Sequence, residues 1–179
     1  MRRSELEHLI RAAGAIADAP QIVVIGSQAV LAQFPDAPAA LLASMEADVY
    51  PRLRPERAEL IDGAIGEGSR FHETFGYYAQ GVGPETATLP RGWEGRLISV
   101  KNANTNGIEG LCLEVHDLAI SKYVAGREKD VEFTRDLATH RMTSKQPLLD
   151  RLAKTRLQTP LRHAAERRIA RDFPSRAAR

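Results

Sequence analysis

Two neighbouring stretches decide the fold that this sequence predicts: IVVIGSQAVLAQF at Ile22–Phe34 and SMEADVYP at Ser44–Pro51. The first is an apolar strand that runs into a glycine–serine turn and then into residues compatible with a helix. The second carries two carboxylates, Glu46 and Asp48, two positions apart in a strand-like run. Because side chains alternate across a strand, we expect both carboxylates on one face of the sheet.

The chemistry of these residues favours a site for a cation and an anion together. Two carboxylates on one face repel each other, and a divalent cation such as Mg²⁺ relieves that repulsion. The turn at Gly26 and Ser27 offers backbone N–H groups and a hydroxyl to a phosphate. The structural alternatives are a tight strand-to-helix turn with Ser27 as the N-cap, and an exposed face of an edge strand for the two acids.

This order of features resembles the nucleotidyltransferase fold of the polymerase-beta type. It is more closely similar to the minimal prokaryotic nucleotidyltransferase-like proteins, which include the AbiEii-type toxins of toxin–antitoxin systems, and to an uncharacterised bacterial branch. A second matching segment is HDLAISKYVAGREKDVEF at His116–Phe133. In that group a helical lysine precedes an Arg-x-Lys-Asp element, matched here by Lys122, Arg127, Lys129 and Asp130.

The resemblance implies a role for each matched residue. Glu46 and Asp48 would be catalytic and hold Mg²⁺, while Gly26 and Ser27 would bind phosphate of a nucleoside triphosphate. The matching segment at His116–Phe133 implies roles for three further residues. Lys122 and Arg127 would bind the nucleotide, and Asp130 would orient Lys122 or complete the catalytic site.

The implied activity is transfer of a nucleotide from a nucleoside triphosphate to a hydroxyl of RNA, protein or a small molecule. A cognate antitoxin or self-association is the expected protein partnership. Departures from the family pattern favour an alternative, a nucleotide-binding or protein-interaction module without catalysis. Glu46 stands where Asp is usual, and RLISV at Arg96–Val100 lacks a third carboxylate, for which Glu114 is a candidate substitute.

Composition restricts the class of protein. The chain has 179 residues, 43% hydrophobic and 27% charged, which is ordinary for a globular domain. We expect no membrane span, since no apolar run approaches about 20 residues. Charged residues interrupt the N-terminal segment, so we expect a cytoplasmic protein. The single cysteine, Cys112, excludes an internal disulfide and is expected to be buried.

The C-terminal region is rich in arginine, which raises a third interpretation, RNA binding through a basic tail. The alternative is a solvated helix face followed by a frayed terminus. The basic residues are Arg151, Lys154, Arg156, Arg162, Arg167, Arg168, Arg171, Arg176 and Arg179.

Hydrophobic periodicity predicts an α/β (α+β) fold with a core at 1–115 and a helical part at 116–179. The resemblance implies that the core is a nucleotidyltransferase-like mixed sheet flanked by helices. Ser4 and Glu7 are interpreted as a capping box at the start of the first helix. Strands are expected at 21–25, 46–49, 71–79, 96–100 and 110–115. Helices are expected at 4–17, 27–33, 56–65, 117–125, 129–140, 145–154 and 160–172.

Overall fold

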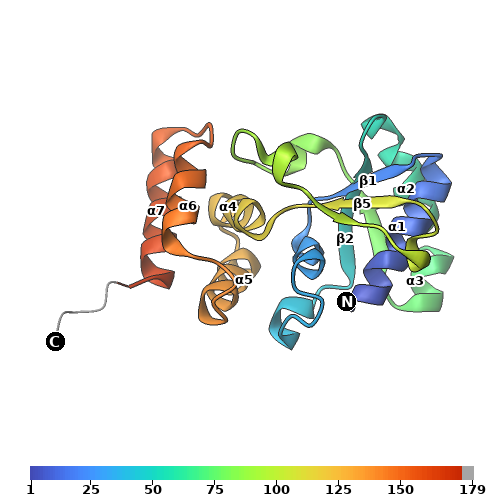
Figure 1. Cartoon of the computed structure of the whole chain (residues 1–179), viewed down its shortest axis with the longest axis horizontal. Helices are drawn as coiled ribbons and strands as arrows, with labels where there is room; N and C mark the ends of the chain where they lie inside the picture. Colours follow the sequence, from blue (N-terminus) through green and yellow to red (C-terminus); the bar gives the residue numbers. More distant parts are fainter. Residues whose placement is uncertain (175–179) are drawn as a thin grey trace. The chain divides into compact units, whose positions relative to one another are not determined.

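The computed structural model describes residues 1–174, so Arg176 and Arg179 of the basic tail lie outside the described residues. The chain divides into two compact units. The first unit comprises Met1–Ala87 and Glu94–Glu114. The second comprises Thr88–Trp93 and the chain from Val115 onward. Figure 1 shows the whole chain, coloured by position along the sequence.

The first unit is built on a five-stranded mixed sheet of order β3-β2-β1-β5-β4. Its central strand β1 pairs antiparallel with β2 and parallel with β5. At the two edges, β3 runs parallel to β2 and β4 runs antiparallel to β5. The strands are β1 (Gln21–Val24), β2 (Glu46–Pro51), β3 (Tyr78–Gly81), β4 (Ile98–Val100) and β5 (Glu109–Cys112).

Helices of the first unit bury apolar stripes against this sheet. The stripe of α1 consists of residues spaced three and four apart, which share one helix face, and α1 and α2 also pack against each other. The α-helices are α1 (Arg3–Ala17), α2 (Ala58–Ile65) and α3 (Arg70–Phe75). The 3₁₀ helices are η1 (Ser27–Ala32), η2 (Ala39–Leu42), η3 (Pro55–Arg57), η4 (Pro84–Thr86), η5 (Trp93–Arg96) and η6 (Ala103–Thr105).

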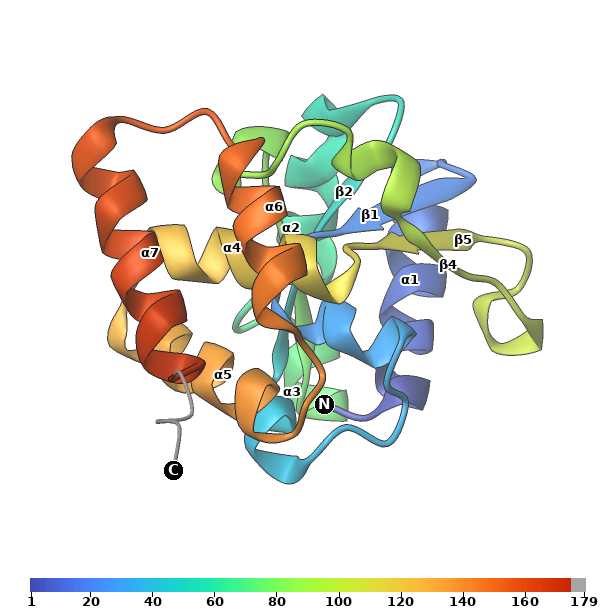
Figure 2. The ribbon, with the colours of Figure 1, turned by 60° about the vertical axis from the view of Figure 1, so that its left-hand side comes forward.

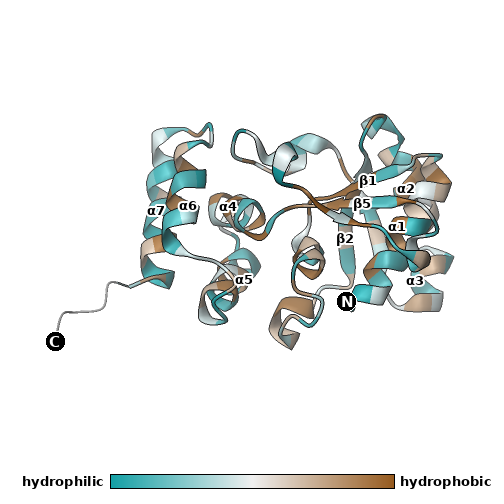
Figure 3. Cartoon of the chain, in the orientation of Figure 1, coloured by the Kyte–Doolittle hydropathy of each residue, from teal (hydrophilic) through white to brown (hydrophobic). Residues whose placement is uncertain are grey.

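Strand β1 forms the centre of the core in this unit. Ile22, Val23 and Val24 are at most 1% exposed, and Figure 3 shows the hydrophobic character of the strand. When a strand has neighbours on both sides and both of its faces are covered, its sequence is a continuous run of apolar residues and does not alternate between apolar and polar. The run that predicts this strand is therefore explained by its central position.

The second unit is helical within the described residues. Helix α4 packs against each of the other three, and α6 and α7 lie side by side in Figures 1 and 2. The short segment Thr88–Trp93 joins this unit through the Arg91 N–H, which donates to the Lys154 carbonyl at 3.0 Å. The helices are α4 (Val115–Ala125), α5 (Glu128–Thr139), α6 (Lys145–Ala153) and α7 (Thr159–Asp172).

The prediction of a strand over residues 71–79 is wrong. Residues Arg70–Phe75 form α3, and the strand begins only at Tyr78. The Ser69 hydroxyl accepts the His72 N–H at the start of this helix, and Gly76 ends it in the left-handed region with φ +76°. Phe71 and Phe75 are four residues apart and pack together with ring centroids 4.7 Å apart, a helical spacing.

The other elements match their predictions within a few residues. The α/β fold with a mixed sheet flanked by helices is confirmed, as is the hairpin of β4 and β5. Among residues 1–174, no helix combines the length and apolar character needed to cross a membrane.

Candidate functional site

The turn after β1 lies directly against the second carboxylate of β2. The Ile25 N–H donates to the Asp48 carbonyl at 3.0 Å. A Cβ built on Gly26 would lie 2.6 Å from Asp48 Oδ2 and 3.0 Å from the Asp48 backbone nitrogen. Glycine is therefore the residue that lets the backbone approach Asp48 this closely. The structure brings Gly26 and Asp48 together.

Both carboxylates of β2 are on the same face of the strand. Glu46 and Asp48 are half-buried, whereas Ala47 and Val49 between and beyond them are fully buried. In the neighbouring strand Tyr78 is directly opposite Glu46, and its hydroxyl donates to Glu46 Oε2 at 3.4 Å. Burial raises the pKa of Tyr78, and the charges of Glu46, Glu67 and Asp48 raise it further. The face is therefore strongly acidic.

This acidic face fits a magnesium ion shared with a phosphate ligand. Mg²⁺ prefers hard oxygen ligands and is usually held by one or two carboxylates plus substrate phosphates. Within residues 1–174, no group of three or more His, Cys, Asp and Glu side chains is placed to hold one metal. Glu46 and Asp48 together supply the two carboxylates that such a shared site needs.

Ser27 begins η1, a 3₁₀ helix of six residues with Gly26 as its N-cap. We expected a short helix here, and the observed element is a 3₁₀ helix in which few aligned peptide dipoles can add together. A phosphate bound at this turn would therefore depend on the half-buried Ser27 hydroxyl and on individual N–H groups.

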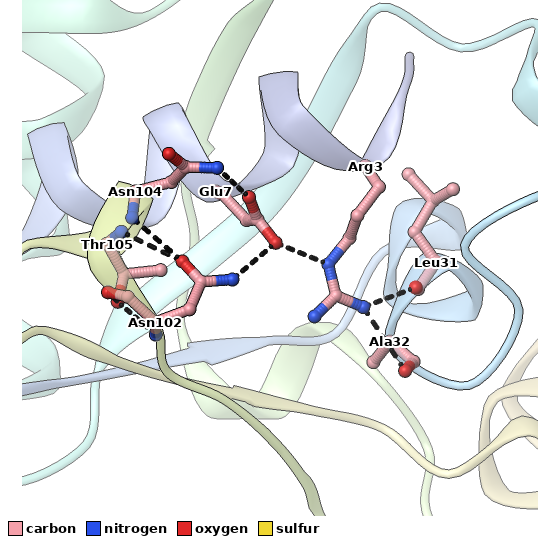
Figure 4. Close-up of polar contacts among 7 residues, drawn as sticks. All are labelled: Arg3, Glu7, Leu31, Ala32, Asn102, Asn104 and Thr105. Carbon is pink, nitrogen blue, oxygen red and sulfur yellow. Dashed lines mark hydrogen bonds and ion pairs between the residues drawn. The ribbon is translucent and has the colours of Figure 1, made fainter.

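The other end of η1 is fixed to α1. Arg3 Nη1 donates to the carbonyls of Leu31 at 2.7 Å and Ala32 at 3.2 Å, as Figure 4 shows. Arg3 Nε in turn donates to Glu7 Oε1 at 2.9 Å. A guanidinium that satisfies the terminal carbonyls of a helix fixes the position of that helix. The segment that carries Ser27 is thus held at both ends.

Glu7 is the centre of this network. It is 5% exposed and accepts hydrogen bonds from Asn102 Nδ2 and Asn104 Nδ2, each at 2.8 Å (Figure 4). Burial alone would raise the pKa of Glu7, but the bonds from Asn104, Asn102 and Arg3 outweigh it and lower the pKa. The charged form is therefore favoured.

The predicted capping box of Ser4 and Glu7 is wrong. The N-cap of α1 is Arg2, and the Glu5 carboxylate accepts the Arg2 N–H at 2.7 Å. The motif has two acids two residues apart, and the local pattern alone does not say which one bonds to the helix start. Glu7 is left for partners distant in sequence.

A second cluster of predicted residues lies in the helical unit. Asp130 is 1% exposed and forms ion pairs with Lys122 Nζ at 3.5 Å and Arg127 Nε at 2.7 Å. Burial would raise the pKa of Asp130, but the Arg127 hydrogen bond and the Lys122 charge lower it. Asp130 also accepts the Arg127 N–H at 3.2 Å and so forms the capping box of α5. The structure therefore brings Lys122, Arg127 and Asp130 together.

One buried residue of η1, directly after Ser27, is not singled out by the sequence analysis. Gln28 is fully buried, and its Oε1 and Nε2 have no hydrogen-bond partner within residues 1–174. A buried amide without partners is unfavourable by about 1–3 kcal/mol for each group. The sequence signal was available, since Gln28 is a long polar side chain followed directly by the apolar residues Ala29, Val30 and Leu31.

Two histidines, the single cysteine and Glu114 complete the set of residues that could contribute chemistry. His72 Nδ1 accepts the Gly68 N–H at 3.1 Å, and its ring packs on Tyr78. His116 Nε2 accepts the Ser144 N–H at 3.2 Å. Cys112 is fully buried, as expected, and burial raises its pKa to about 12. Glu114 follows β5 and is half-buried.

The basic residues of α7 are not simply a solvated row. Arg162 donates to the carbonyls of Leu152 and Thr155, each at 2.8 Å. Arg171 is paired with Asp172 at 2.8 Å. These contacts direct two of the positive side chains to acceptors within the unit, which leaves less of the helix for RNA.

Comparison with known proteins assigns the chain to a family. No curated protein and no solved structure matches it. A family model described as a nucleotidyltransferase of unknown function matches residues 4–173, from the first turn of α1 to just beyond α7. The protein therefore belongs to the DUF6036 family of nucleotidyltransferases.

Proposed function

We propose that this protein is a Mg²⁺-dependent nucleotidyltransferase that moves a nucleotide from a nucleoside triphosphate to a hydroxyl on RNA, protein or a small molecule. The observation that carries the proposal is the contact between the Gly26 turn and the Asp48 carboxylate in a chain of nucleotidyltransferase family. A phosphate-binding turn beside a pair of acids is what a metal-bound triphosphate needs.

In the first unit, the residues of this turn and of β2 would act together. Glu46 and Asp48 would hold Mg²⁺, which would neutralise phosphate charge and polarise the phosphorus under attack. The Ser27 hydroxyl would donate to a phosphate oxygen. Asp48 is also our candidate for the base that takes the proton of the acceptor hydroxyl.

In the second unit, Lys122 and Arg127 would bind phosphate groups of the nucleotide. The Lys122 ammonium is a compact point charge suited to phosphate, and Asp130 would orient it through their 3.5 Å ion pair. Because Asp130 is 1% exposed, we assign it a positioning role. A cytoplasmic toxin–antitoxin pair, with a cognate antitoxin or self-association, is the setting that we propose.

Calorimetric titration of each nucleoside triphosphate, with and without Mg²⁺, tests this function. We expect binding that depends on Mg²⁺ in the wild type and is lost in Asp48→Asn. The matched control is Asp36→Asn, which removes an exposed carboxylate of the same unit and should bind as the wild type does. Absence of binding for every triphosphate would contradict the proposal.

The second candidate function is a nucleotide-binding or interaction module that does not catalyse transfer. It is favoured by Glu46 at the position where the family usually has Asp, and by the absence of a third carboxylate grouped with this pair among residues 1–174. Triphosphate binding that persists in Asp48→Asn, without release of pyrophosphate by the wild type, would support this candidate over the transferase.

A further inference from the structure

Arg168 of α7 approaches the turn between α4 and α5 unusually closely. A Cβ built on Gly126 would lie 2.2–2.3 Å from the Arg168 Cζ, Nη2 and Nη1 atoms. Because all three distances are nearly equal, the guanidinium lies flat on the glycine. Gly126 has φ +63°, a left-handed conformation that favours glycine, and a side chain at this position would have to displace the guanidinium. The turn is thus shaped to admit the Arg168 side chain.

Only one donor of this guanidinium has a described partner. Arg168 Nη1 donates to the Tyr123 carbonyl at 2.7 Å, and the side chain makes no other hydrogen bond or ion pair within residues 1–174. Arginine has five N–H donors in a fixed fork. A helix cap needs few of them, and the Gly126 N–H already bonds to the Lys122 carbonyl at 2.9 Å. Capping of α4 therefore leaves most of the fork unused.

Two further cations are close to this turn in sequence, one in the last turn of α4 and one directly after Gly126. Lys122 precedes the residue whose carbonyl Arg168 binds, and Arg127 directly follows Gly126. Both are paired with the single buried carboxylate of Asp130. No carboxylate of residues 1–174 lies within ion-pair distance of Arg168. A half-buried guanidinium without a carboxylate partner is a group that a bound anion stabilises.

We propose that Arg168, together with Lys122, binds the polyphosphate of the nucleotide at the α4–α5 turn. The proposal rests on the proposed function for its ligand, and it adds a phosphate ligand from α7, outside the segments that carried the nucleotidyltransferase resemblance. A planar fork binds phosphate through two parallel N–H bonds, and Gly126 holds that fork in place.

Calorimetry with two probes tests the proposal: Mg²⁺ with a nucleoside triphosphate, and inorganic tripolyphosphate alone. We expect Arg168→Gln to lower the affinity for both probes by about tenfold or more, because a hydrogen bond from a charged group is lost. The matched control is Arg167→Gln, an exposed arginine one residue earlier, which should stay within about twofold. Unchanged affinity in Arg168→Gln, with only a lower melting temperature, would show a helix cap and overturn the proposal.

A second variant displaces the guanidinium and keeps its charge. Gly126→Ala should weaken tripolyphosphate binding as Arg168→Gln does, and the double variant should be no weaker than Arg168→Gln alone. Additive effects in the double variant would contradict the role of Gly126 in holding the fork.

A measurement on the wild type covers the case in which Arg168→Gln does not fold. Phenylglyoxal modifies accessible guanidinium groups, and mass spectrometry reports each arginine separately. Tripolyphosphate should slow modification of Arg168 and leave Arg167 unchanged. Equal rates with and without tripolyphosphate would overturn the proposal.

The outcomes separate this proposal from the proposed function. If Arg168→Gln leaves magnesium-dependent triphosphate binding intact, Arg168 does not bind the phosphate, and the proposed transferase function still stands. If tripolyphosphate binding depends on Arg168 but no triphosphate binds in a magnesium-dependent way, the phosphate site at Arg168 is supported and the transferase function is contradicted. A third outcome is that Arg168→Gln weakens the binding of a single-stranded RNA but not the binding of tripolyphosphate. The ligand would then be a polynucleotide, and the proposal would be overturned.

Discussion

The backbone of Gly26 lies against the carboxylate of Asp48, with 2.6 Å between Asp48 Oδ2 and the position that a Cβ of residue 26 would take. Gly26 has φ −77° and ψ 177°, an extended conformation that any residue adopts. The requirement for glycine is therefore one of space. Any side chain at this position must move the acid that we assign to the metal.

Gly26→Ala is expected to lower the free energy of unfolding by about 1–3 kcal/mol, because overpacking forces neighbours to shift. It should also abolish magnesium-dependent triphosphate binding, since Asp48 moves. Chemical denaturation and calorimetry measure the two effects. Gly63→Ala is the control, because a Cβ on Gly63 of α2 meets nothing within 4 Å. That variant should gain about 0.5–1 kcal/mol from helix propensity. Wild-type binding by Gly26→Ala would contradict the assignment.

Glu7→Gln should destabilise the first unit at neutral pH by about 3 kcal/mol, as expected when one member of a buried ion pair is removed. The pKa of Glu7 is lower in the folded chain than its ordinary value of 4.5, so its contribution is present above pH 4.5 and is lost as pH falls through the folded pKa. Urea unfolding at pH 7 and pH 3 should therefore show a difference between wild type and variant that shrinks in acid.

The exposed Glu59 of α2 supplies the control for that experiment. Glu59→Gln should leave the free energy of unfolding within about 0.5 kcal/mol at both pH values. A difference between wild type and Glu7→Gln that stays constant from pH 7 to pH 3 would mean that the charge of Glu7 is not what stabilises the network.

Asp130→Asn should leave Arg127 and Lys122, whose side chain is 13% exposed, without their shared carboxylate. We expect a loss of about 3–5 kcal/mol, the range for breaking a buried pair. Thermal unfolding measures this loss, with Glu132→Gln as an exposed control on the same helix. If phosphate binding improves in a folded Asp130→Asn variant, Asp130 competes with the phosphate for Lys122 and does not orient it.

His8 gives the first unit a pH dependence near neutrality. Its Nδ1 lies 2.8 Å from the Tyr77 hydroxyl, its ring contacts Phe71 and Phe75, and burial followed by the charge of Arg11 lowers its pKa. The folded state therefore favours neutral His8, and stability should fall as pH drops below 6.5 toward the folded pKa.

The melting temperature, measured from pH 8 to pH 5, checks this prediction. The wild type should lose stability over that range, and His8→Phe should lose less. His163→Gln changes an exposed histidine of α7 and should follow the wild-type curve. Parallel curves for wild type and His8→Phe would exclude His8 as the cause.

Much of the first unit could be predicted because its signals are local. A continuous apolar run marked β1, and turn residues between two short apolar runs marked the β4–β5 hairpin. The acid pair on β2 followed from the two-residue period of a strand. Residues 71–79 were misread because aromatic residues favour strands, although the four-residue spacing of Phe71 and Phe75 and the flanking Ser69 and Gly76 indicate a helix.

Long-range partners could not be read from the sequence. Glu7 bonds to Asn104 across 97 residues, and no local pattern distinguishes it from Glu5, which caps the helix. Arg168 was grouped with a basic tail, whereas its approach to Gly126 depends on how α7 packs on α4. Residues that act through tertiary packing carry no periodic signature.

The pairing of β1 with β5 determines when the first unit can finish folding during synthesis. Gln21 Nε2 donates to Glu109 Oε2 across 88 residues, and β1 has β5 as its parallel neighbour. A ribosome releases β1 long before it has made β5, so one edge of the central strand stays open while the intervening chain emerges. Ile22, Val23 and Val24 lie on that strand. The nascent chain therefore presents an apolar edge that other chains can bind until Cys112 has left the exit tunnel.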